Sequence, residues 1–338
     1  MQTAKAIVLA GDCGGPEPWP SLGLAARQLA PVANKPILFH QLEALARAGI
    51  RETAIVTDGL TDASIREAVG DGSSWGLEVR YVKHDGREDA LVLPGVTDFA
   101  HGTPLLVQHG DVLFREPVAT LWERFADTAF DALVLYPGTR SSSNGVNGTP
   151  LTGSAYMLRA DLQEVVRREA AASPPHGLDE VLARLRDCGA NIQAQAVEAC
   201  MPCRGRAEVL LEANRWMLED VEPGQPAERV LRSELQGRVE LHPSAEVRDS
   251  LIRGPVSIAA GACISNAYIG PYTSIGANVT AESVEIEHSI VFQGAQLRFL
   301  GARLEGSLVG PGAEITREFN VPRAMRLSVG ERAEIALA

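Results

Sequence analysis

Residues 255–279 read PVSIAAGACISNAYIGPYTSIGANV. Isoleucine recurs in this stretch as Ile258, Ile264, Ile269 and Ile275, and small residues or glycine follow each one. Steps of about six residues are typical of a parallel β-helix, in which each face of a triangular coil is one short strand. Because an isolated coil cannot bury its apolar face, such coils must stack on one another. The stretch therefore predicts a domain of stacked coils.

The composition changes just before this repeat. Residues 220–227, DVEPGQPA, are rich in proline, glycine and acid, which is typical of a linker, and they follow a helix expected at 207–219. The apolar pattern continues less regularly at 284–286, 289–291 and 308–309. We therefore expect an α/β domain at residues 1–222 and a β-helix domain at residues 228–338. We also expect an exposed terminal coil of the β-helix to pack on another subunit.

Before the linker, short β-rich apolar runs alternate with amphipathic helical stretches. Strands are expected at 5–10, 53–57, 77–82, 104–108, 131–136, 154–158 and 191–197. This alternation indicates a doubly wound, mostly parallel sheet with helices on both faces. Ligands of such sheets bind beyond the carboxyl ends of the strands. Two segments there are candidates for a site: the glycine-rich loop at 11–15, and His109-Gly110-Asp111 after a central apolar run.

Composition excludes several classes of protein. The 338 residues contain 31 Lys and Arg against 43 Asp and Glu, for a net charge of −12, and nothing resembles the basic stripe of a nucleic-acid-binding protein. The sequence has no apolar run long enough to span a bilayer and no export signal in MQTAKAIVLAG, so we expect a cytoplasmic protein that does not bind membranes. Five scattered cysteines predict reduced thiols.

Four further stretches of the sequence read KAIVLAG (5–11), RQLAPVANKPILFHQLEALARAGI (27–50), HGDVLF (109–114) and LLEANRWML (210–218). They resemble the sugar-1-phosphate nucleotidylyltransferases, most closely the long form of glucose-1-phosphate thymidylyltransferase, which carries a β-helical tail. Residues 250–276 and 282–292 of the tail resemble the same branch. The resemblance implies a nucleotidylyltransferase-like α/β domain followed by a left-handed parallel β-helix.

The resemblance also implies a reaction. In this family an oxygen of a sugar 1-phosphate attacks the α-phosphorus of a nucleoside triphosphate in line and releases pyrophosphate. The protein must hold two polyanions together, neutralise the charge that develops on the α-phosphate and keep Mg²⁺ on the phosphates. The implied partners are therefore a nucleoside triphosphate and a sugar 1-phosphate, and a homo-oligomer is expected by analogy.

Matching the family motifs to this chain gives a set of expected site residues. Catalysis is expected of Arg27 and Asp111, and Asp111 is also the expected metal ligand. The expected nucleotide-binding residues are Leu9, Ala10, Gly11, Gly14, Gln28 and Gly110. The expected sugar-binding residues are Gly153 and Asp179.

The phosphate loop departs from the family pattern GGxGTRLxPxT. Residues 11–20 read GDCGGPEPWP, in which Gly11 and Gly14 match but the signature arginine has no counterpart. Glu17 or Pro16 falls in its place. A carboxylate there would repel a triphosphate, because like charges about 4 Å apart interact by roughly 4 kcal/mol at an intermediate dielectric. The family lysine that follows is Arg27, which keeps the positive charge with a different reach and a forked geometry.

Other family positions differ as well. The second metal-binding aspartate is replaced by Cys203, and a thiolate is a poor ligand for magnesium. The base-recognition stretch is replaced by 84–90, HDGREDA, and the usual Glu-Lys-Pro turn is missing from 138–158. The family's sugar-site glutamate aligns near Gly177, where Asp179 is the nearest carboxylate.

Two hypotheses of different classes follow. The first is a sugar-1-phosphate nucleotidylyltransferase with an altered substrate and a phosphate clamp rebuilt from Arg27, Arg87, Arg204 or Arg206. The second is a catalytically silent homologue that binds a ligand or an active partner and acts as a regulatory or structural subunit. Acyl transfer by the tail is a third alternative. The CxxC spacing of Cys200 and Cys203 leaves a metal or dithiol role open beside chance spacing.

Overall fold

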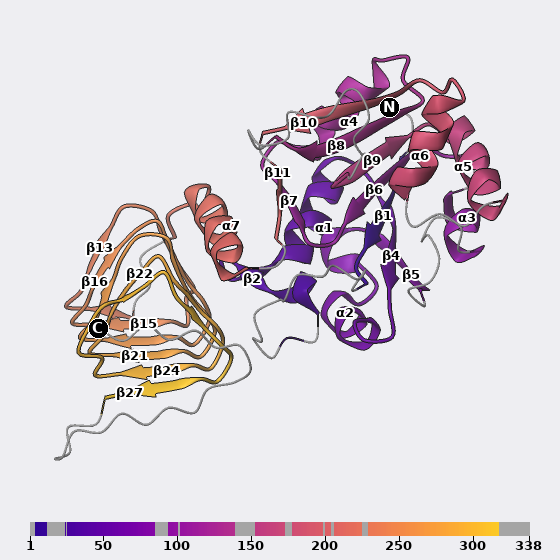
Figure 1. Ribbon diagram of the computed structural model, residues 1–338. Helices are drawn as coiled ribbons and strands as arrows, with labels where there is room; N and C mark the ends of the chain where they lie inside the picture. The colour runs from indigo at the N-terminus through magenta and orange to yellow at the C-terminus, as the bar shows by residue number, and fades with distance from the viewer. Residues whose placement is uncertain are drawn as a thin grey trace. The chain divides into compact units, whose positions relative to one another are not determined.

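The computed structural model describes residues 4–11, 24, 26–84, 94–100, 102–138, 153–172, 178–198, 200–203, 206–224 and 229–317 (Figure 1). By internal contacts the chain divides into two compact units. Of the described residues, those between 4 and 11, 26 and 29, and 37 and 202 belong to the α/β unit. Residue 24, residues 30–36 and the described residues from 203 to 317 belong to the β-helix unit.

A seven-stranded sheet forms the centre of the α/β unit, with strand order β10-β8-β9-β6-β1-β4-β5. Its strands are β1 (Lys5–Leu9), β4 (Glu52–Thr57), β5 (Glu78–Lys83), β6 (Leu105–His109), β8 (Ala132–Pro137), β9 (Ala155–Leu158) and β10 (Ile192–Val197). Neighbouring strands are parallel except β9, which runs antiparallel to both β6 and β8. All seven expected strands therefore form, in a mixed and mostly parallel sheet.

Helices cover both faces of this sheet (Figure 1). They are α1 (Ile37–Arg47), α2 (Asp62–Val69), α3 (Pro94–Ala100), α4 (Val118–Ala126), α5 (Ala160–Ala172) and α6 (Leu178–Asp187). In β1, Ala6 and Val8 join the core beneath α1, α2 and α4, whereas Ile7 joins the core beneath α3, α5 and α6. A strand buried on both faces reads as a continuous apolar run, which is why residues 6–9 of β1, AIVL, are all apolar.

Shorter elements complete this part of the chain. A 3-10 helix, η1 (Arg27–Leu29), precedes the antiparallel hairpin of β2 (Pro31–Val32) and β3 (Lys35–Pro36). A second antiparallel pair joins β7 (Val112–Phe114) to β11 (Cys200–Pro202). The sequence patterns did not predict either pair, because strands of two or three residues are too short to show a period.

Three parallel sheets form the β-helix. One contains β12 (Val230–Leu231), β15 (Glu246–Arg248), β18 (Cys263–Ser265), β21 (Thr280–Glu282), β24 (Gln296–Arg298) and β27 (Glu314–Thr316). The next contains β13 (Glu234–Gln236), β16 (Leu251–Arg253), β19 (Tyr268–Ile269), β22 (Glu285–Glu287) and β25 (Leu304–Glu305). The third contains β14 (Val239–Leu241), β17 (Val256–Ile258), β20 (Thr273–Ile275), β23 (Ile290–Val291) and β26 (Leu308–Val309).

Register explains the spacing seen in the sequence. Ile252 pairs with Ile269, and Ile269 pairs with Ile286, so side chains 17 residues apart stack inside the coil. All three isoleucines are fully buried. The intervals of six, five and six residues are thus three sides of one coil. The predicted fold class, a doubly wound and mostly parallel sheet followed by a left-handed parallel β-helix, is confirmed.

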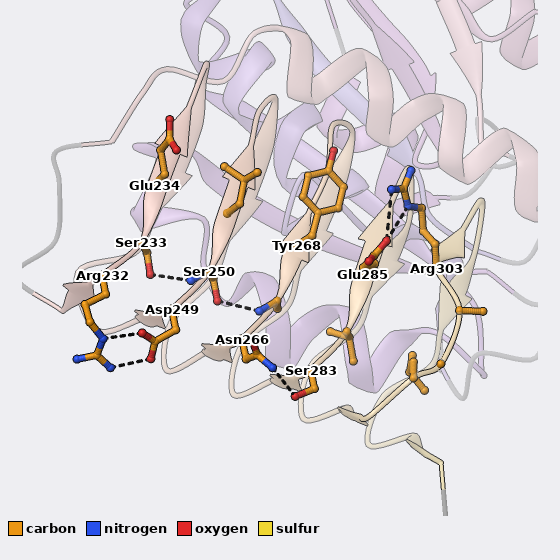
Figure 2. Close-up of a pocket in the computed structure, with 16 residues that line it drawn as sticks. Arg232, Ser233, Glu234, Asp249, Ser250, Asn266, Tyr268, Ser283, Glu285 and Arg303 are labelled. Atoms are coloured by element: carbon orange, nitrogen blue, oxygen red, sulfur yellow. Dashed lines mark hydrogen bonds and ion pairs between the residues drawn. The ribbon is translucent and has the colours of Figure 1, made fainter.

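A polar groove of about 910 Å³ runs along one corner of the β-helix (Figure 2). Its charged groups bind one another from coil to coil. Nitrogens Nε and Nη2 of the Arg232 guanidinium donate to the carboxylate of Asp249, at 2.5 and 2.7 Å. Arg303 pairs with Glu285 at 3.3 Å. Exposed pairs of this kind contribute little energy each. The buried isoleucine stacks therefore carry most of the stability of the coils.

The boundary between the two compact units differs from the boundary that the sequence predicted at residues 222–228. Helix α7 (Ala207–Glu219) forms over the expected range, but it groups with the β-helix, as does the hairpin at Ala30–Pro36. The reason is that α7 contacts β2 of the hairpin and β20 of the β-helix.

No helix in the described part of the chain has the length and apolar character needed to cross a membrane.

The isoleucine stack gives a stability prediction. We expect Ile269→Ala to lower the free energy of unfolding of the β-helix by about 2–5 kcal/mol, because it leaves a cavity between two buried neighbours. The matched control is Leu231→Ala, whose side chain is 46% exposed, and we expect a loss under about 1 kcal/mol. Chemical unfolding followed by circular dichroism measures both. Equal losses for the two variants would contradict the stacking account.

Candidate functional site

The carboxyl ends of β1 and β6 lie side by side, since Leu9 is in register with His109. Gly110 N donates a hydrogen bond to Leu9 O at 2.7 Å, which keeps the two backbone segments together beyond the ends of β1 and β6. Gly11, which follows β1, and Asp111, which follows β6, therefore continue from the same edge of the sheet. This is the edge at which sheets of this type bind ligands.

Close packing favours glycine at position 110. A Cβ at this position would lie 3.0 Å from Leu9 O and 3.1 Å from Gln28 Cγ, and the first of these is backbone that cannot turn aside. The absence of a side chain brings Gln28 and the end of β1 against the loop that carries Asp111. Five of the six expected nucleotide-binding residues therefore lie together: Leu9, Ala10, Gly11, Gln28 and Gly110.

Arg27 and Asp111 form an ion pair at the same edge. Arg27 Nε lies 3.4 Å from Asp111 Oδ2. The side chains are 12% and 4% exposed, respectively, so the pair is largely withdrawn from water. A buried charge is tolerated when it is paired, and removing one partner leaves the other uncompensated. The two residues expected to carry catalysis are therefore adjacent and electrostatically linked.

Gln28 supplies an uncommitted acceptor beside this pair. It is 1% exposed, and its Nε2 donates to Gly11 O at 3.3 Å. Its Oε1 has no hydrogen-bond partner in the part of the chain that the structure describes. A buried acceptor without a donor is costly. An N–H group of a bound nucleobase would satisfy it.

Gln41 was not singled out as a site residue. It lies on α1, is 4% exposed, and donates through Nε2 to His109 O at 2.8 Å and to Val112 O at 2.6 Å. Its Oε1 accepts a hydrogen bond from Gln108 Nε2 at 3.3 Å. Gln41 thus holds the chain on both sides of Gly110 and Asp111. The signal in the sequence was a glutamine within the apolar stripe of a helix.

Asp58 is a second residue that the sequence analysis missed. It follows β4, and its Oδ1 accepts from the backbone N–H groups of Leu60 and Thr61, each at 2.8 Å. A Cβ on Gly11 would lie 3.2 Å from Asp58 Oδ2. A carboxylate therefore borders the start of the phosphate loop from the neighbouring strand. Its signal was its place at the carboxyl end of a parallel strand.

The expected sugar-binding residues also meet. Gly153 N donates to Asp179 Oδ1 at 3.1 Å, and Tyr156 donates through its hydroxyl to the same oxygen at 2.6 Å. A Cβ on Gly153 would lie 2.7 Å from the Tyr156 ring, so glycine is needed there. Tyr156, which was not expected, fixes the orientation of the Asp179 carboxylate at the start of α6.

Several expected positions lie outside the described residues. They are Gly14, Pro16, Glu17, Arg87, Arg204 and Gly177. Of the proposed clamp arginines, Arg27 is placed as described above and Arg206 is exposed at the start of α7 in the β-helix unit. The structure therefore leaves the proposed replacement for the lost signature arginine as a prediction.

Donor chemistry limits the way in which Mg²⁺ can bind. No group of three or more His, Cys, Asp or Glu side chains within the described residues is placed to hold a metal ion. Cys203, at the second family position, is a buried thiol. Magnesium prefers oxygen ligands and is commonly held by one or two carboxylates together with substrate phosphates. Asp111 fits as one such carboxylate. Position 203 supplies no second carboxylate, because its residue is cysteine.

Cys200 is held as a neutral thiol. Burial raises its pKa to about 11, although a hydrogen bond with the Ser154 side chain acts in the opposite direction. The thiolate is the form that reacts and binds metals, so this cysteine is inert near neutral pH. Burial of both Cys200 and Cys203 accounts for the CxxC spacing as part of a packed core.

Comparison with known proteins places this geometry in context. The family described as Nucleotidyl transferase matches residues 5–150. Glucose-1-phosphate thymidylyltransferases of Streptomyces griseus and Streptomyces antibioticus are 33% and 31% identical, each over 98% of this chain and 99% of their own length. The low-salt glycan biosynthesis nucleotidyltransferase Agl11 of Haloferax volcanii is 30% identical over 98% of this chain and 100% of its length.

A solved structure shares the fold. It comes from Bacillus anthracis, is assigned as a glucose-1-phosphate thymidylyltransferase and was crystallised with a sucrose. Its TM-score is 0.53 at 18% identity, and the match covers 66% of this chain and 98% of that chain.

Burial and the raised pKa of Cys200 predict its reactivity. At pH 8 a pKa near 11 leaves about one thiol in a thousand ionised, so we expect iodoacetamide to modify the exposed Cys188 and Cys263 at least 10-fold faster than Cys200. The rate at Cys200 should rise as the pH approaches 11. Mass spectrometry of tryptic peptides measures each site, and denaturation in urea is the control that should equalise the rates. Rapid labelling of Cys200 in the folded protein would contradict this account.

Proposed function

Because this chain belongs to the nucleotidyltransferase family that includes the glucose-1-phosphate thymidylyltransferases, we propose that it transfers a nucleotidyl group to a sugar 1-phosphate. The substrates are a nucleoside triphosphate and a sugar 1-phosphate, and the products are a nucleotide-sugar and pyrophosphate. The observation that carries the proposal is the withdrawn Arg27–Asp111 pair, which lies at the ligand-binding edge of the sheet beside Gln28 and Gly110.

Arg27 is the proposed electrostatic catalyst. An oxygen of the sugar phosphate attacks the α-phosphorus, the bond from that phosphorus to the bridging oxygen breaks, and pyrophosphate leaves with the bonding electrons. Negative charge builds on the oxygens around the α-phosphorus in this step, and a preorganised guanidinium stabilises it. Asp111 orients the guanidinium before substrate binds, because its Oδ2 lies 3.4 Å from Arg27 Nε.

Nucleotide binding follows from the packing around Gly110. The proposed contacts are the backbone of Leu9, Ala10 and Gly11 for the nucleotide, which can approach closely because these positions carry small or inward-facing side chains. Gln28 Oε1 supports base binding, since it is buried and lacks a donor within the described residues. On the sugar side, the proposed contacts are Gly153 and the Asp179 carboxylate that Tyr156 orients.

Magnesium is part of the proposal with Asp111 as its protein carboxylate. When bound, the ion would neutralise phosphate charge, which a chain with a net charge of −12 does not do through its overall charge. We also propose a cytoplasmic homo-oligomer that binds neither nucleic acid nor membrane. Supporting this are the acidic composition and the relatives' character as enzymes of small molecules.

The proposal is tested by pyrophosphate release. The purified chain is incubated with each nucleoside triphosphate, a panel of sugar 1-phosphates and Mg²⁺, and we expect release with at least one pair. Arg27→Met should lower kcat/KM by about 100-fold or more, because the removed charge acts on the transition state. Arg27→Lys is the matched control and should retain more activity than Arg27→Met.

Absence of release with every pair, in protein whose melting is cooperative, would contradict the enzyme proposal. Binding of a triphosphate without turnover would then support the silent homologue. Equal activity of the native chain and Arg27→Met would contradict the proposed role of Arg27 and would leave the proposed reaction intact.

Cys203 gives a separate prediction about magnesium. Restoring an oxygen ligand with Cys203→Asp should lower the Mg²⁺ concentration for half-maximal activity by about 10-fold, because a second carboxylate strengthens binding of a hard cation. Cys203→Ser is the control, since it has nearly the size of cysteine without the charge. A magnesium dependence that is the same for both variants would show that position 203 does not bind the metal.

A further inference from the structure

The polar groove of the β-helix ends at a corner that is longer than its neighbours (Figure 2). Four successive corners between the first two sheets have two residues each, at 232–233, 249–250, 266–267 and 283–284. The corner between β24 and β25 has five residues, 299–303. Residues 300–303 line the end of the groove. The longer corner therefore bounds the groove at one end.

The short corners keep side chains where the backbone favours glycine. Their first residues are Arg232, Asp249, Asn266 and Ser283, with φ of 48°, 47°, 50° and 54°. Left-handed backbone is uncommon for residues other than glycine, although asparagine and aspartate adopt it more readily. All four residues line the groove. Polar side chains therefore border it in four successive coils.

Serine hydroxyls tie these corners to one another. Ser233 Oγ accepts a hydrogen bond from Ser250 N at 3.1 Å, and Ser250 Oγ accepts one from Ala267 N at 3.0 Å. The two hydroxyls donate in turn to Leu231 O at 2.8 Å and Arg248 O at 2.6 Å. Because these bonds already fix the floor of the groove, binding a ligand there would order little of the protein.

The centre of the groove combines an apolar surface with polar groups (Figure 2). Tyr268 is partly buried, and it is in register with Leu251 on one side and Glu285 on the other. The Arg303 guanidinium lies 5.3 Å from the centre of the Tyr268 ring. Asn266 Nδ2 donates to Ser283 Oγ at 2.9 Å. Within the described residues, the Tyr268 hydroxyl and Asn266 Oδ1 make no hydrogen bond, so both can bind a ligand.

The charges of the groove do not suit an anion. Two arginines, Arg232 and Arg303, and three carboxylates, Glu234, Asp249 and Glu285, line it and leave a formal charge of −1. A phosphate group would therefore meet like charges along the groove, and both arginines are already paired with carboxylates. A ligand without charge meets no such repulsion.

The backbone beneath the groove offers no place for a peptide strand. Strands β16, β19 and β22 are each paired on both sides within their sheet. Adding a strand requires an exposed sheet edge, whose main-chain groups supply the affinity. Recognition in the groove must therefore come from side chains.

We propose that this groove binds a neutral saccharide of a few sugar rings. Each sugar hydroxyl both donates and accepts, so it matches a surface on which donors such as Arg303 lie beside acceptors such as Asn266 Oδ1. The apolar face of a sugar ring packs on Tyr268 and Leu251.

The size and energetics of the groove are consistent with such a ligand. Its volume of about 910 Å³ lies in the range of small-molecule sites, roughly 300–1,000 Å³. The ion pairs that a saccharide would rearrange are exposed, so breaking them costs little. All of these residues belong to the β-helix unit, and the inference does not depend on the proposed nucleotidyl transfer.

Calorimetric titration of the full chain with maltotriose, cellotriose, mannotriose and raffinose tests the proposal. We expect at least one trisaccharide to bind with a Kd below about 1 mM. Hydrogen–deuterium exchange locates the ligand: peptides covering residues 249–268 should exchange more slowly when it is bound. Glucose 1-phosphate, which is charged, should leave exchange in these peptides unchanged.

Two pairs of variants give matched comparisons. Tyr268→Ala should weaken binding by about 10-fold or more, whereas Tyr268→Phe keeps the ring and should lose less. Arg303→Ala should weaken binding by about fivefold or more. Its control is Arg248→Ala, because Arg248 is also exposed and paired with a carboxylate but does not line the groove. Binding to that control should equal binding to the native chain.

Three results would overturn the proposal. The first is the absence of binding by all four trisaccharides at about 10 mM. The second is equal affinity of the native chain and a Tyr268→Ala variant with an unchanged melting temperature, which would place the saccharide elsewhere. The third is protection of residues 249–268 by tetralysine but by none of the trisaccharides, which would indicate a site for cationic peptides. None of these results bears on pyrophosphate release.

Discussion

The hydrogen bond from Gly110 N to Leu9 O is the constraint on which the candidate site depends. It joins the chain just beyond the ends of β1 and β6, and glycine at 110 avoids a Cβ that would lie 3.0 Å from Leu9 O. The position of Asp111 follows from it, and Arg27 Nε lies 3.4 Å from that carboxylate. A methyl group at this residue would lie 3.0 Å from Leu9 O and 3.1 Å from Gln28 Cγ, so these neighbours would have to move by a few tenths of an ångström.

Buried amides hold the backbone of two connections of this protein in place. Gln41 binds the backbone on both sides of Gly110 and Asp111, and Asn214 binds the hairpin that follows η1. An apolar side chain could fill either space, but it would not select one backbone path. Satisfied hydrogen bonds are directional, so an amide specifies position as well as packing. The two residues have corresponding roles in separate compact units.

Much of the architecture could be predicted from local patterns. The seven strands of the α/β sheet and the helix at 207–219 form where periodicity placed them, because burial on one or two faces imposes a spacing on apolar residues. Arg27, Asp111, Gly153 and Asp179 could be expected as site residues only from resemblance to a family, and their contacts with one another were not predicted. Gln41, Asp58 and Tyr156 were not identified as functional, because single polar residues carry no period.

By itself, the sequence determined the alternation of strands and helices before the linker, the step of about six residues after it, and the apolar faces of both. It also determined that the usual phosphate-loop arginine is absent. Those are properties of neighbouring residues, and the chain displays them in any conformation. Only the tertiary structure decided that β9 runs antiparallel, that α7 and the 31–36 hairpin group with the β-helix, and that Asn214 binds residues 33, 272 and 274. These contacts join residues up to 181 positions apart, and such partners are selected by the competition of whole surfaces for burial and hydrogen bonds.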